Sequence, residues 1–375
     1  MAIFSKDTDD KETTTYECKT LCATANVGYQ CRANSDETTI MKQMQLSKPG
    51  GLDKLHLVEI DTPRVRDNEI LVKVAASSLN YHDLLVALGS IPTEDKRVLL
   101  CDASGEVVEV GTNVSKWHVG DHIMSACFPK WIEGRPKREY LSFIGDNEDG
   151  YATEYIALSE TAVTKIPQGW SPAEVATLPC AGLTAWRALV DEGNLQAGET
   201  VLIQGTGGVS IFALQLAKSM GAKVVATSSS LEKLDKLKAL GADELINYKE
   251  TPEWGKEVKI KTHNEGVDHV VEVGGGGTFS QSVIATKLGG HIAMIGVLSG
   301  PSAENVILPE IFLKQIRTNG IAMGNHQSQI AMVEYMENSD IKPIISDTFD
   351  LAELANAFKH QMDHKHFGKI SITMS

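Results

Sequence analysis

The sequence predicts an α/β fold with two parts, a compact β-barrel followed by a doubly wound parallel sheet. Between residues 69 and 157 the apolar segments are short, β-branched and bounded by turns, which is typical of a barrel. Between residues 201 and 324 strands alternate with helices of roughly 10 residues, and this order predicts a parallel sheet. The 375 residues suffice for two domains that each bury a core.

The barrel part begins near Met41, and we place its boundary at residue 170. After the parallel sheet, two helices and a final strand are predicted, and residues 325–375 are expected to return and complete the barrel. The expected barrel strands are Glu69–Leu79, Gly105–Gly111, Val119–Met124 and Tyr151–Ala157, and the returning elements are Ser328–Asn338, Leu351–Met362 and Phe367–Ile372.

Residues 1–40 are rich in Thr, Asp, Glu and Asn without sustained periodicity, which predicts a flexible extension. Three of the six cysteines, Cys18, Cys22 and Cys31, lie there, but no fourth ligand stands at a zinc-like spacing. Their role stays open. Six cysteines in a chain of this length form no disulfide framework, so free thiols are expected.

A glycine-rich turn lies near the start of the parallel-sheet domain, which we place at residues 171–324. The apolar run Val201–Ile203 leads into Gly205-Thr-Gly-Gly-Val-Ser210, and apolar residues then recur at helical spacing. This order of strand, glycine turn and helix brings backbone N–H groups and a helix N-terminus against a pyrophosphate. Ser210 stands where the usual fingerprint has Gly or Ala, so a structural turn in an unrelated α/β protein is the alternative.

The elements after this turn follow the nucleotide-binding order. Lys223–Thr227 predicts the second strand, and Ser229–Glu232 predicts a capping box that opens the next helix. Leu231, Leu234 and Leu237 are expected on the buried side of that helix. Further strands are predicted at Asp243–Tyr248, Asp268–Val273 and His291–Gly296 and near Ile321.

The chain is acidic, with a formal net charge of −14 and a calculated pI of about 5.3. This balance argues against nucleic acid and anionic membranes as partners. No apolar run approaches the roughly 18 residues of a transmembrane helix. The acidic first ten residues are also unlike a signal or transit peptide, so a cytoplasmic location is expected.

Six short segments form a recognisable set: Gly105–Gly111, Val119–Asp121, Leu178–Trp186, Gly205–Ser210, Leu240–Asp243 and His366–Ile370. Together they resemble the medium-chain dehydrogenase/reductase superfamily, in particular its zinc-free alcohol-dehydrogenase-like and quinone-oxidoreductase-like branch. The resemblance runs from about Met41 to Met374. It implies a GroES-like catalytic barrel, a Rossmann domain, an active site in the cleft between them, and hydride transfer to or from a nicotinamide. It also implies a homodimer joined through the nucleotide domains.

The places of the superfamily's catalytic zinc ligands are the main departure. In zinc-dependent relatives a Cys, a His followed by Glu, and a later Cys hold the metal. The matching residues here are Asn80, Cys101 followed by an aspartate, and Cys180. An amide is a poor zinc ligand, so we expect no metal, with a residual site of two thiolates and His82 as the alternative. The four-cysteine lobe of the structural zinc is also missing, since the matching stretch holds only Cys127.

A metal-free enzyme needs another group to polarise the substrate oxygen or to deliver a proton. Asn80 offers an amide donor, and metal-free relatives carry an asparagine there, near the nicotinamide ribose. Tyr81 and His82 offer titratable groups, with a barrel-packing aromatic and a surface histidine as the respective alternatives. Asp102 is expected to anchor the barrel or the floor of the cleft.

The resemblance also implies the cofactor contacts. Thr184 stands before the domain junction, and Gly274 begins a four-glycine run after the fourth strand of the sheet, for which a loose loop is the alternative. The segment Gly296–Leu298 resembles the one that faces the carboxamide. Apart from the residues near the 2′-phosphate of NADPH, which are described below, the implied cofactor contacts are Thr184, Gly205, Gly207, Gly208, Val209, Gly274, Gly296, Val297, Leu298, Gly324, Asn325 and Lys369.

The end of the second strand predicts NADPH rather than NADH. An Asp or Glu at that place binds both ribose hydroxyls in NAD-specific Rossmann domains, but here the residue is Ser228. Lys233 is one turn into the next helix, and Tyr248 matches a tyrosine that contacts the 2′-phosphate in quinone-reductase relatives. A solvated lysine and a strand-end aromatic are the alternatives.

The expected protein is thus an NADPH-dependent oxidoreductase that reduces a small carbonyl, quinone or activated alkene without zinc. Two other functions stay open. One is a zinc-dependent alcohol dehydrogenase, which Asn80 disfavours. The other is a nucleotide-binding protein without turnover, since the sequence shows no single catalytic acid.

Overall fold

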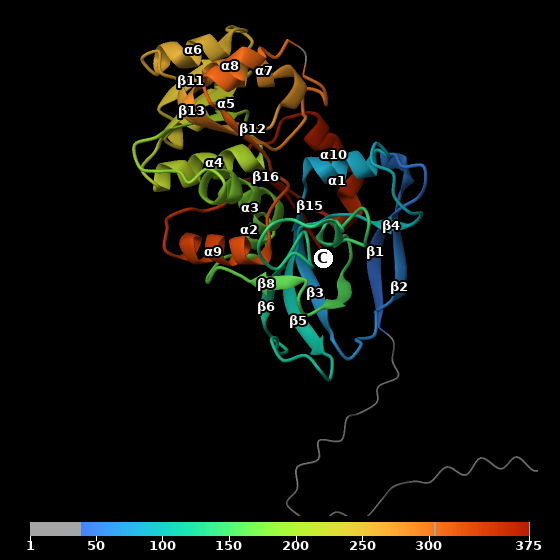
Figure 1. Ribbon diagram of the computed structural model, residues 1–375. Helices are drawn as coiled ribbons and strands as arrows, with labels where there is room; N and C mark the ends of the chain where they lie inside the picture. Colours follow the sequence, from blue (N-terminus) through green and yellow to red (C-terminus); the bar gives the residue numbers. More distant parts are fainter. Residues whose placement is uncertain (1–38, 304, 375) are drawn as a thin grey trace, which may run out of the picture. The chain divides into compact units, whose positions relative to one another are not determined.

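The computed structural model describes residues 39–303 and 305–374 (Figure 1). The predicted N-terminal extension, with its three cysteines, lies outside the described residues except at its last two positions. The strands form a six-stranded sheet, a seven-stranded sheet and a small three-stranded sheet. This confirms the predicted α/β fold with a barrel-like part and a parallel sheet.

The barrel is built from both ends of the described chain. In Figure 1 the red strands of the C-terminal segment lie beside blue β3 (Glu69–Ser78), and Ser371 pairs with Ser78 in antiparallel register. The strand order is β15-β16-β3-β5-β6-β8, with β7 also paired to β3. The other bounds are β5 Ser104–Val110, β6 His122–Ser125, β7 Tyr155–Ser159, β8 Val163–Lys165, β15 Ile345–Asp350 and β16 Lys369–Thr373. The three-stranded sheet holds β1 Ile40–Leu46, β2 Leu55–Asp61 and β4 Arg97–Val98.

The six-stranded sheet is parallel throughout, in the order β11-β10-β9-β12-β13-β14. The chain order therefore reverses between β9 (Thr200–Gln204) and β12 (Val267–Glu272), and ligands of such sheets bind at the carboxyl ends of the strands at that reversal. The remaining strands are β10 Lys223–Ser228, β11 Glu244–Asn247, β13 Thr286–Met294 and β14 Arg317–Gly320. The helices after these strands are α4 Gly208–Ser219, α5 Leu231–Ala239, α6 Trp254–Lys261, α7 Phe279–Ala285 and α8 Leu308–Leu313.

The start of α5 corrects one sequence expectation. Its N-cap is Ser230, whose hydroxyl accepts a hydrogen bond from the Lys233 amide, so the capping box that was expected between Ser229 and Glu232 is wrong. The helix therefore begins one residue later than expected. Leu231, its first residue, is 65% exposed, while Leu234 and Leu237 are buried as predicted.

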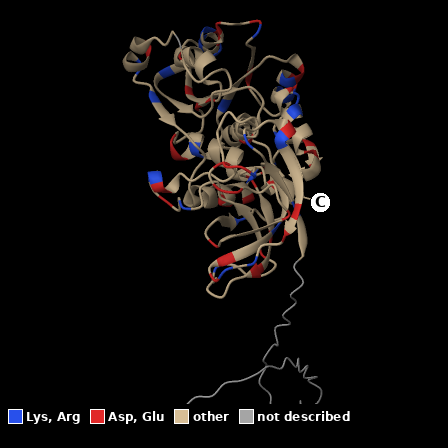
Figure 2. Ribbon diagram, turned by 90° about the vertical axis from the view of Figure 1, so that its right-hand side faces the viewer, with Lys and Arg blue, Asp and Glu red and all other residues tan. Residues whose placement is uncertain are grey.

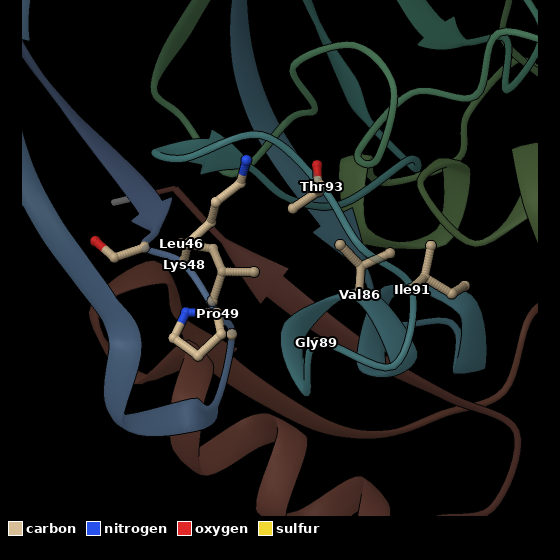
Figure 3. A pocket seen from close by; sticks show the side chains of 9 residues that line it. Leu46, Lys48, Pro49, Val86, Gly89, Ile91 and Thr93 are labelled. Atoms are coloured by element: carbon tan, nitrogen blue, oxygen red, sulfur yellow. The ribbon is translucent and has the colours of Figure 1, made fainter.

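Helix α1 (Tyr81–Ala87) was missed by the sequence analysis. It begins at Asn80, whose backbone N–H donates to the carboxylate of Asp83 at 2.9 Å. At its far end the chain turns at Gly89, where a Cβ would lie 2.3 Å from the carbonyl oxygen of Pro49. The cavity beside this turn has only about 10 Å³, enough for no more than a water molecule (Figure 3). The turn is therefore a packing feature that fixes the end of α1.

A run of helical turns joins the barrel to the parallel sheet. It contains α2 (Pro172–Val175), a π-helical turn at Leu178–Gly182, α3 (Leu183–Trp186) and a second π-helical turn at Arg187–Asp191. Such turns are rare and frequently occur at functional sites. The remaining helices are α9 His326–Glu337 and α10 Leu354–Met362. Within the described residues no helix combines the length and apolar character needed to cross a membrane.

Candidate functional site

The glycine turn after β9 has the geometry that its sequence predicts. Gly205 has a positive φ of 69°, and Gly207 is the N-cap of α4. The hydroxyl of Ser210 donates to the carbonyl of Gln204 at 2.7 Å, which explains a serine at the third position of the motif. Gly368, just before β16, donates its N–H to Thr206 at 2.9 Å. The C-terminal segment therefore runs along the turn.

A buried carboxylate organises the neighbouring loop. Glu272, the last residue of β12, is fully buried and accepts hydrogen bonds from the side chain of Gln204 at 2.7 Å and from the Gly274 and Gly275 amides at 2.9 and 2.8 Å. The hydroxyls of Thr278 and Ser282 donate to it as well. These bonds join the end of β9 to the four-glycine run, which forms a 3₁₀ turn at Gly275–Gly277. The alternative of a loose loop therefore does not hold.

A third segment lies against this loop. The N–H of Leu298 donates to Val273 and that of Ser299 donates to Gly274, at 3.2 and 2.7 Å. The side chains of Val297 and Leu298 are substantially exposed. The structure thus brings the predicted residues Gly274, Gly296, Val297 and Leu298 together at the carboxyl end of β12 and β13.

Lys369 links the glycine turn to the barrel. Its stem packs on Gly208, where a Cβ would lie 2.5 Å from the Lys369 Cδ. Its ammonium, only 3% exposed as a residue, donates to the Leu79 carbonyl at 2.7 Å and to the Asn80 Oδ1 at 2.5 Å, and lies 3.4 Å from Asp102. One side chain therefore joins the predicted cofactor site to the predicted catalytic site.

Both polar atoms of the Asn80 amide are bonded to protein groups. Its Nδ2 donates to Asp102 at 2.8 Å and lies 3.5 Å from the Cys101 sulfur, while its Oδ1 accepts from Lys369. Asn80 is 8% exposed. The sequence predicts that the Asn80 amide is available to donate to a substrate oxygen. In the structure the amide is already bonded, and it positions the Asp102 carboxylate and the Lys369 ammonium.

Two buried carboxylates lie under this amide. Asp102 also accepts from the Ser78 hydroxyl at 2.6 Å and from the Cys180 amide at 2.9 Å. Burial raises the pKa of Asp102 to about 6, although Lys369 opposes the shift. Burial and the charge of Asp102 raise the pKa of Asp83 to about 7. The cluster therefore changes its protonation near neutral pH.

Tyr81 and His82 occupy the first turn of α1. Tyr81 is 37% exposed, so it is not the barrel-packing aromatic that was the alternative. His82 is half-buried; its Nε2 lies 2.8 Å from Asp146, and its ring packs on Phe143 with centroids 4.2 Å apart. Burial lowers the pKa of His82, but the hydrogen bond to Asp146 and the neighbouring carboxylates outweigh this and raise it. Sequence reasoning missed Asp146, which no local pattern distinguishes.

The structure brings Tyr248 to Ser228, the last residue of β10, whereas Lys233 lies in the first turn of α5. The Tyr248 N–H donates to the Ser228 carbonyl at 3.2 Å, and Tyr248 itself is 41% exposed. The Lys233 ammonium is not free, because it donates to the carbonyls of His364 and His366 at 2.6 and 2.9 Å. Lys233 thereby holds the segment that precedes Lys369.

The other predicted cofactor residues are less closely connected to the carboxyl edge of the parallel sheet. Thr184 is buried in α3, which packs on α4. Gly324 packs on Leu183, and Asn325 caps α9 through the Ser328 amide at 2.8 Å. The neighbouring His326 donates its N–H to the barrel residue Trp131. A hollow of about 620 Å³ on the barrel is lined by none of the predicted site residues.

Two sequence-family models match the chain. The one described as the alcohol dehydrogenase GroES-like domain matches residues 66–168, and the one described as a zinc-binding dehydrogenase matches residues 208–338. The first covers most of the barrel strands and the second most of the parallel sheet.

Similar proteins cover nearly the whole described chain. A zinc-type alcohol dehydrogenase-like protein from Schizosaccharomyces pombe is 37% identical over 85% of this chain and 95% of its own length. A solved NAD-dependent alcohol dehydrogenase superposes with a TM-score of 0.81 at 30% identity, over 89% of this chain and 100% of that one. A solved 2-octenoyl-CoA carboxylase reductase in complex with NADP and 2-octenoyl-CoA gives a TM-score of 0.80 at 26% identity, over 89% and 87%.

Proposed function

The chain belongs to the medium-chain dehydrogenase/reductase superfamily and is an oxidoreductase of the NAD(P)-using type, and from this premise we propose that it is an NADPH-dependent reductase of a carbonyl, quinone or activated alkene that works without catalytic zinc. The proposal depends most on the Lys369 ammonium, which donates to Asn80 and lies beside Asp102. Asn80 stands where zinc-dependent members of the family carry a metal ligand, and Asp102 directly follows a second such position. A fixed cation there supplies positive charge that the relatives obtain from a metal.

The donor set fits a catalytic zinc poorly. Such zinc sites use three protein ligands drawn from Cys, His and carboxylates. Here both Asp102 oxygens accept hydrogen bonds, the Asn80 oxygen accepts from Lys369, and the Nε2 of His82 is bonded to Asp146. Among the described residues, Cys101, Cys127 and Asp102 each place a ligand atom within 4.8 Å of the other two, but the Asp102 carboxylate lies 3.4 Å from the buried Lys369 ammonium, whose charge opposes a second cation there. The proposed chemistry therefore uses no zinc.

The preference for NADPH is supported by local groups. Ser228 removes the charge that would repel a 2′-phosphate, Tyr248 donates its backbone N–H to the Ser228 carbonyl, and Lys233 follows in the first turn of α5. Figure 2 shows Lys and Arg interspersed with Asp and Glu along the ribbon, so a phosphate would depend on these nearby groups. The solved relatives include an NAD-dependent enzyme and an NADP complex, so the argument stands on the residues of this chain.

The glycine turn after β9 and the Gly274 loop after β12 would hold a nicotinamide cofactor, which would supply the hydride. The role of this chain is to place the ring and to hold a proton. Asn80 and Lys369 fix the floor of the site, and His82 holds a proton against Asp146. Exposed Tyr81 lies next to it on the same helical turn. The complex of a relative with 2-octenoyl-CoA favours an activated alkene among the three substrate classes.

We further propose a homodimer joined at the edge of the parallel sheet. Strand β14 is an edge strand, and exposed apolar residues lie near the start of β13 and in and just before α8, the helix that precedes β14. A two-fold partner would cover both features at once. The exposed residues of this group are Leu288, Ile307, Leu308, Phe312 and Leu313.

Steady-state kinetics on a panel of quinones, enones and aldehydes with NADPH and NADH would test the proposal. We expect turnover on at least one class, at least about tenfold better catalytic efficiency with NADPH, and far less than one zinc per chain by elemental analysis. Equal efficiency with NADH would contradict the cofactor assignment. One tightly held zinc whose removal abolishes turnover would favour the alcohol dehydrogenase alternative. Binding of NADPH without turnover on any substrate would favour the non-catalytic one.

A further inference from the structure

A surface loop on the barrel, residues 132–139, is rich in positive charge. It carries three cations and two carboxylates, in a chain whose formal net charge is −14. Every residue of this basic loop is exposed. The proposed hydride transfer uses none of these side chains.

The basic loop is fastened to the start of α9, beside the candidate site. The carbonyl of Gly134 accepts hydrogen bonds from the side chain of Asn325 at 3.3 Å and from the indole of Trp131 at 3.0 Å. The Trp131 carbonyl in turn accepts from the His326 N–H at 3.0 Å. Since Asn325 is a predicted cofactor contact, the loop lies directly against the proposed nicotinamide side of the site.

A row of aromatic rings connects the basic loop to α1. Between ring centroids, Trp131 lies 6.0 Å from Phe128, and Phe128 lies 5.5 Å from Phe143. Phe143 packs on His82, as described above. All three rings of the row before His82 are buried, so they form a packed wall. A substrate that reacts beside His82 and extends along this wall would bring its far end to the basic loop.

Two guanidinium groups of the basic loop lack a carboxylate partner among the described residues. Lys137 pairs with Glu139 at 3.9 Å, whereas Arg135 and Arg138 make no such pair. A guanidinium presents a planar fork of N–H donors that fits two oxygens of a carboxylate or phosphate. The described arginines that do pair with a carboxylate are Arg66, Arg97 and Arg187.

Exposed apolar side chains flank the two guanidinium groups. Ile132 and Leu141 lie at the ends of the basic loop, and both are exposed. Exposed Ile330 is one helical turn after Gln327, whose N–H donates to the Ile132 carbonyl at 3.0 Å. Apolar surface beside unpaired guanidinium groups suits an organic ligand with an anionic end.

We propose that the basic loop binds an anionic group, a carboxylate or a phosphate, at the end of the substrate remote from the reacting carbon. The inference rests on the proposed reductase function and narrows its substrate class to anionic carbonyls, quinones or activated alkenes. Arg135 and Arg138 supply the N–H donors, and Ile132 and Ile330 contact the carbon chain. Such local charge is needed because the overall charge of the protein repels anions.

The test is isothermal titration calorimetry of the full chain in the presence of NADP⁺, with two matched pairs of ligands. One pair is an α,β-unsaturated aldehyde of medium chain length with a terminal carboxylate, and its methyl ester. The other is the crotonyl thioester of phosphopantetheine and that of pantetheine. We expect the anionic member of at least one pair to bind about tenfold more tightly at low salt, and the advantage to shrink as salt is added. The pair that shows the advantage identifies the anionic group.

The double variant Arg135→Gln and Arg138→Gln should lose this advantage. Arg64→Gln is the matched control, because Arg64 is an exposed arginine of the barrel that also lacks a carboxylate partner among the described residues, and it should keep the advantage. Equal affinities within both pairs would overturn the proposal. So would an advantage that persists in the double variant or that Arg64→Gln removes to the same extent.

Turnover of the same ligands with NADPH separates this inference from the reductase proposal. Tighter binding of the anionic member without turnover of any ligand would support the basic loop and contradict the reductase. Turnover of the neutral members with no advantage for the anionic ones would support the reductase and overturn the role of the basic loop.

Discussion

Two buried carboxylates organise the two halves of the candidate site, and they do so with different partners. Glu272 is surrounded by neutral donors: two glycine amides, two hydroxyls and the amide of Gln204. Asp102 accepts from the Ser78 hydroxyl, the Asn80 amide and the Cys180 N–H, but it also lies 3.4 Å from the Lys369 ammonium. Both carboxylates are fully buried.

The partners of the two carboxylates show which contacts each half of the site depends on. Four of the five donors to Glu272 lie within ten residues of it, so this edge is mostly a local structure. The partners of Asp102 come from three segments, residues 78–80, Cys180 and Lys369, and Lys369 is 267 residues away. Losing one neutral donor costs about 1–3 kcal/mol, whereas leaving a buried charge without its partner costs about 3–5 kcal/mol. The barrel half should therefore be the more sensitive.

The largest effect is expected for Lys369→Met. At pH 8 the buried Asp102 of the variant must either stay ionised without its cation or take up a proton, so the free energy of unfolding should fall by up to about 3–5 kcal/mol in a urea titration. At pH 5 the loss should be smaller, because the pKa of Asp102, about 6 with Lys369 present, is higher still without the cation and the carboxyl is then protonated. Lys365→Met, at a side chain 68% exposed, is the control and should change little. An equal loss at both pH values would mean that packing rather than charge dominates.

A second prediction concerns Asp83. Its pKa is about 7 in the folded protein and 3.8 in the unfolded chain, so the folded state binds more protons between pH 4 and 7. This contribution to stability is fully present below pH 4 and is lost as the pH rises through 7, by at most about 4 kcal/mol. Asp83→Asn should remove it.

The measurement for Asp83 is the slope of unfolding free energy against pH in both proteins. Buried His291 and His326 and half-buried His366, with pKa values near 4, have the opposite effect, since stability from them rises with pH. The difference between the two slopes therefore isolates Asp83. Parallel slopes would show that Asp83 titrates normally.

The contrast between the halves also explains what the sequence could predict. The glycine turn and the strands around it are contiguous segments whose backbone pattern fixes their geometry, so they were located from sequence alone. Asn80 and Lys369 were named as site residues, but their mutual bond was not, because it depends on strand pairing between the two ends of the chain. Asp146 and the meeting of Cys127 with Cys101 depend on loops that no periodicity describes.

Glu272→Gln tests the half of the site that Glu272 organises, where all the hydrogen-bond donors are neutral. The side-chain amide of the new glutamine would point its N–H group at backbone N–H groups that need an acceptor. This mismatch should lower the free energy of unfolding by about 1–3 kcal/mol. Because the Gly274 loop loses its anchor, the dissociation constant for NADPH should rise by about tenfold, while kcat should change less. Glu265→Gln, at the exposed glutamate before β12, is the matched control. A loss of stability as large as that of Lys369→Met would remove the distinction between the two halves.

The smallest effect is expected at Lys233, a cation that binds backbone carbonyls rather than a carboxylate. Lys233→Ala should reduce the preference for NADPH by about tenfold, or about 1.4 kcal/mol, because one charged hydrogen bond to the 2′-phosphate is lost. Lys236→Ala, one turn further on and paired with Glu232 at 2.7 Å, is the control and should keep the preference. The decisive comparison is the KM for NADH. Since Lys233 also holds the carbonyls of His364 and His366, a rise in that KM equal to the rise for NADPH would show that the lysine orders the segment before Lys369. An unchanged KM for NADH would assign it to the phosphate.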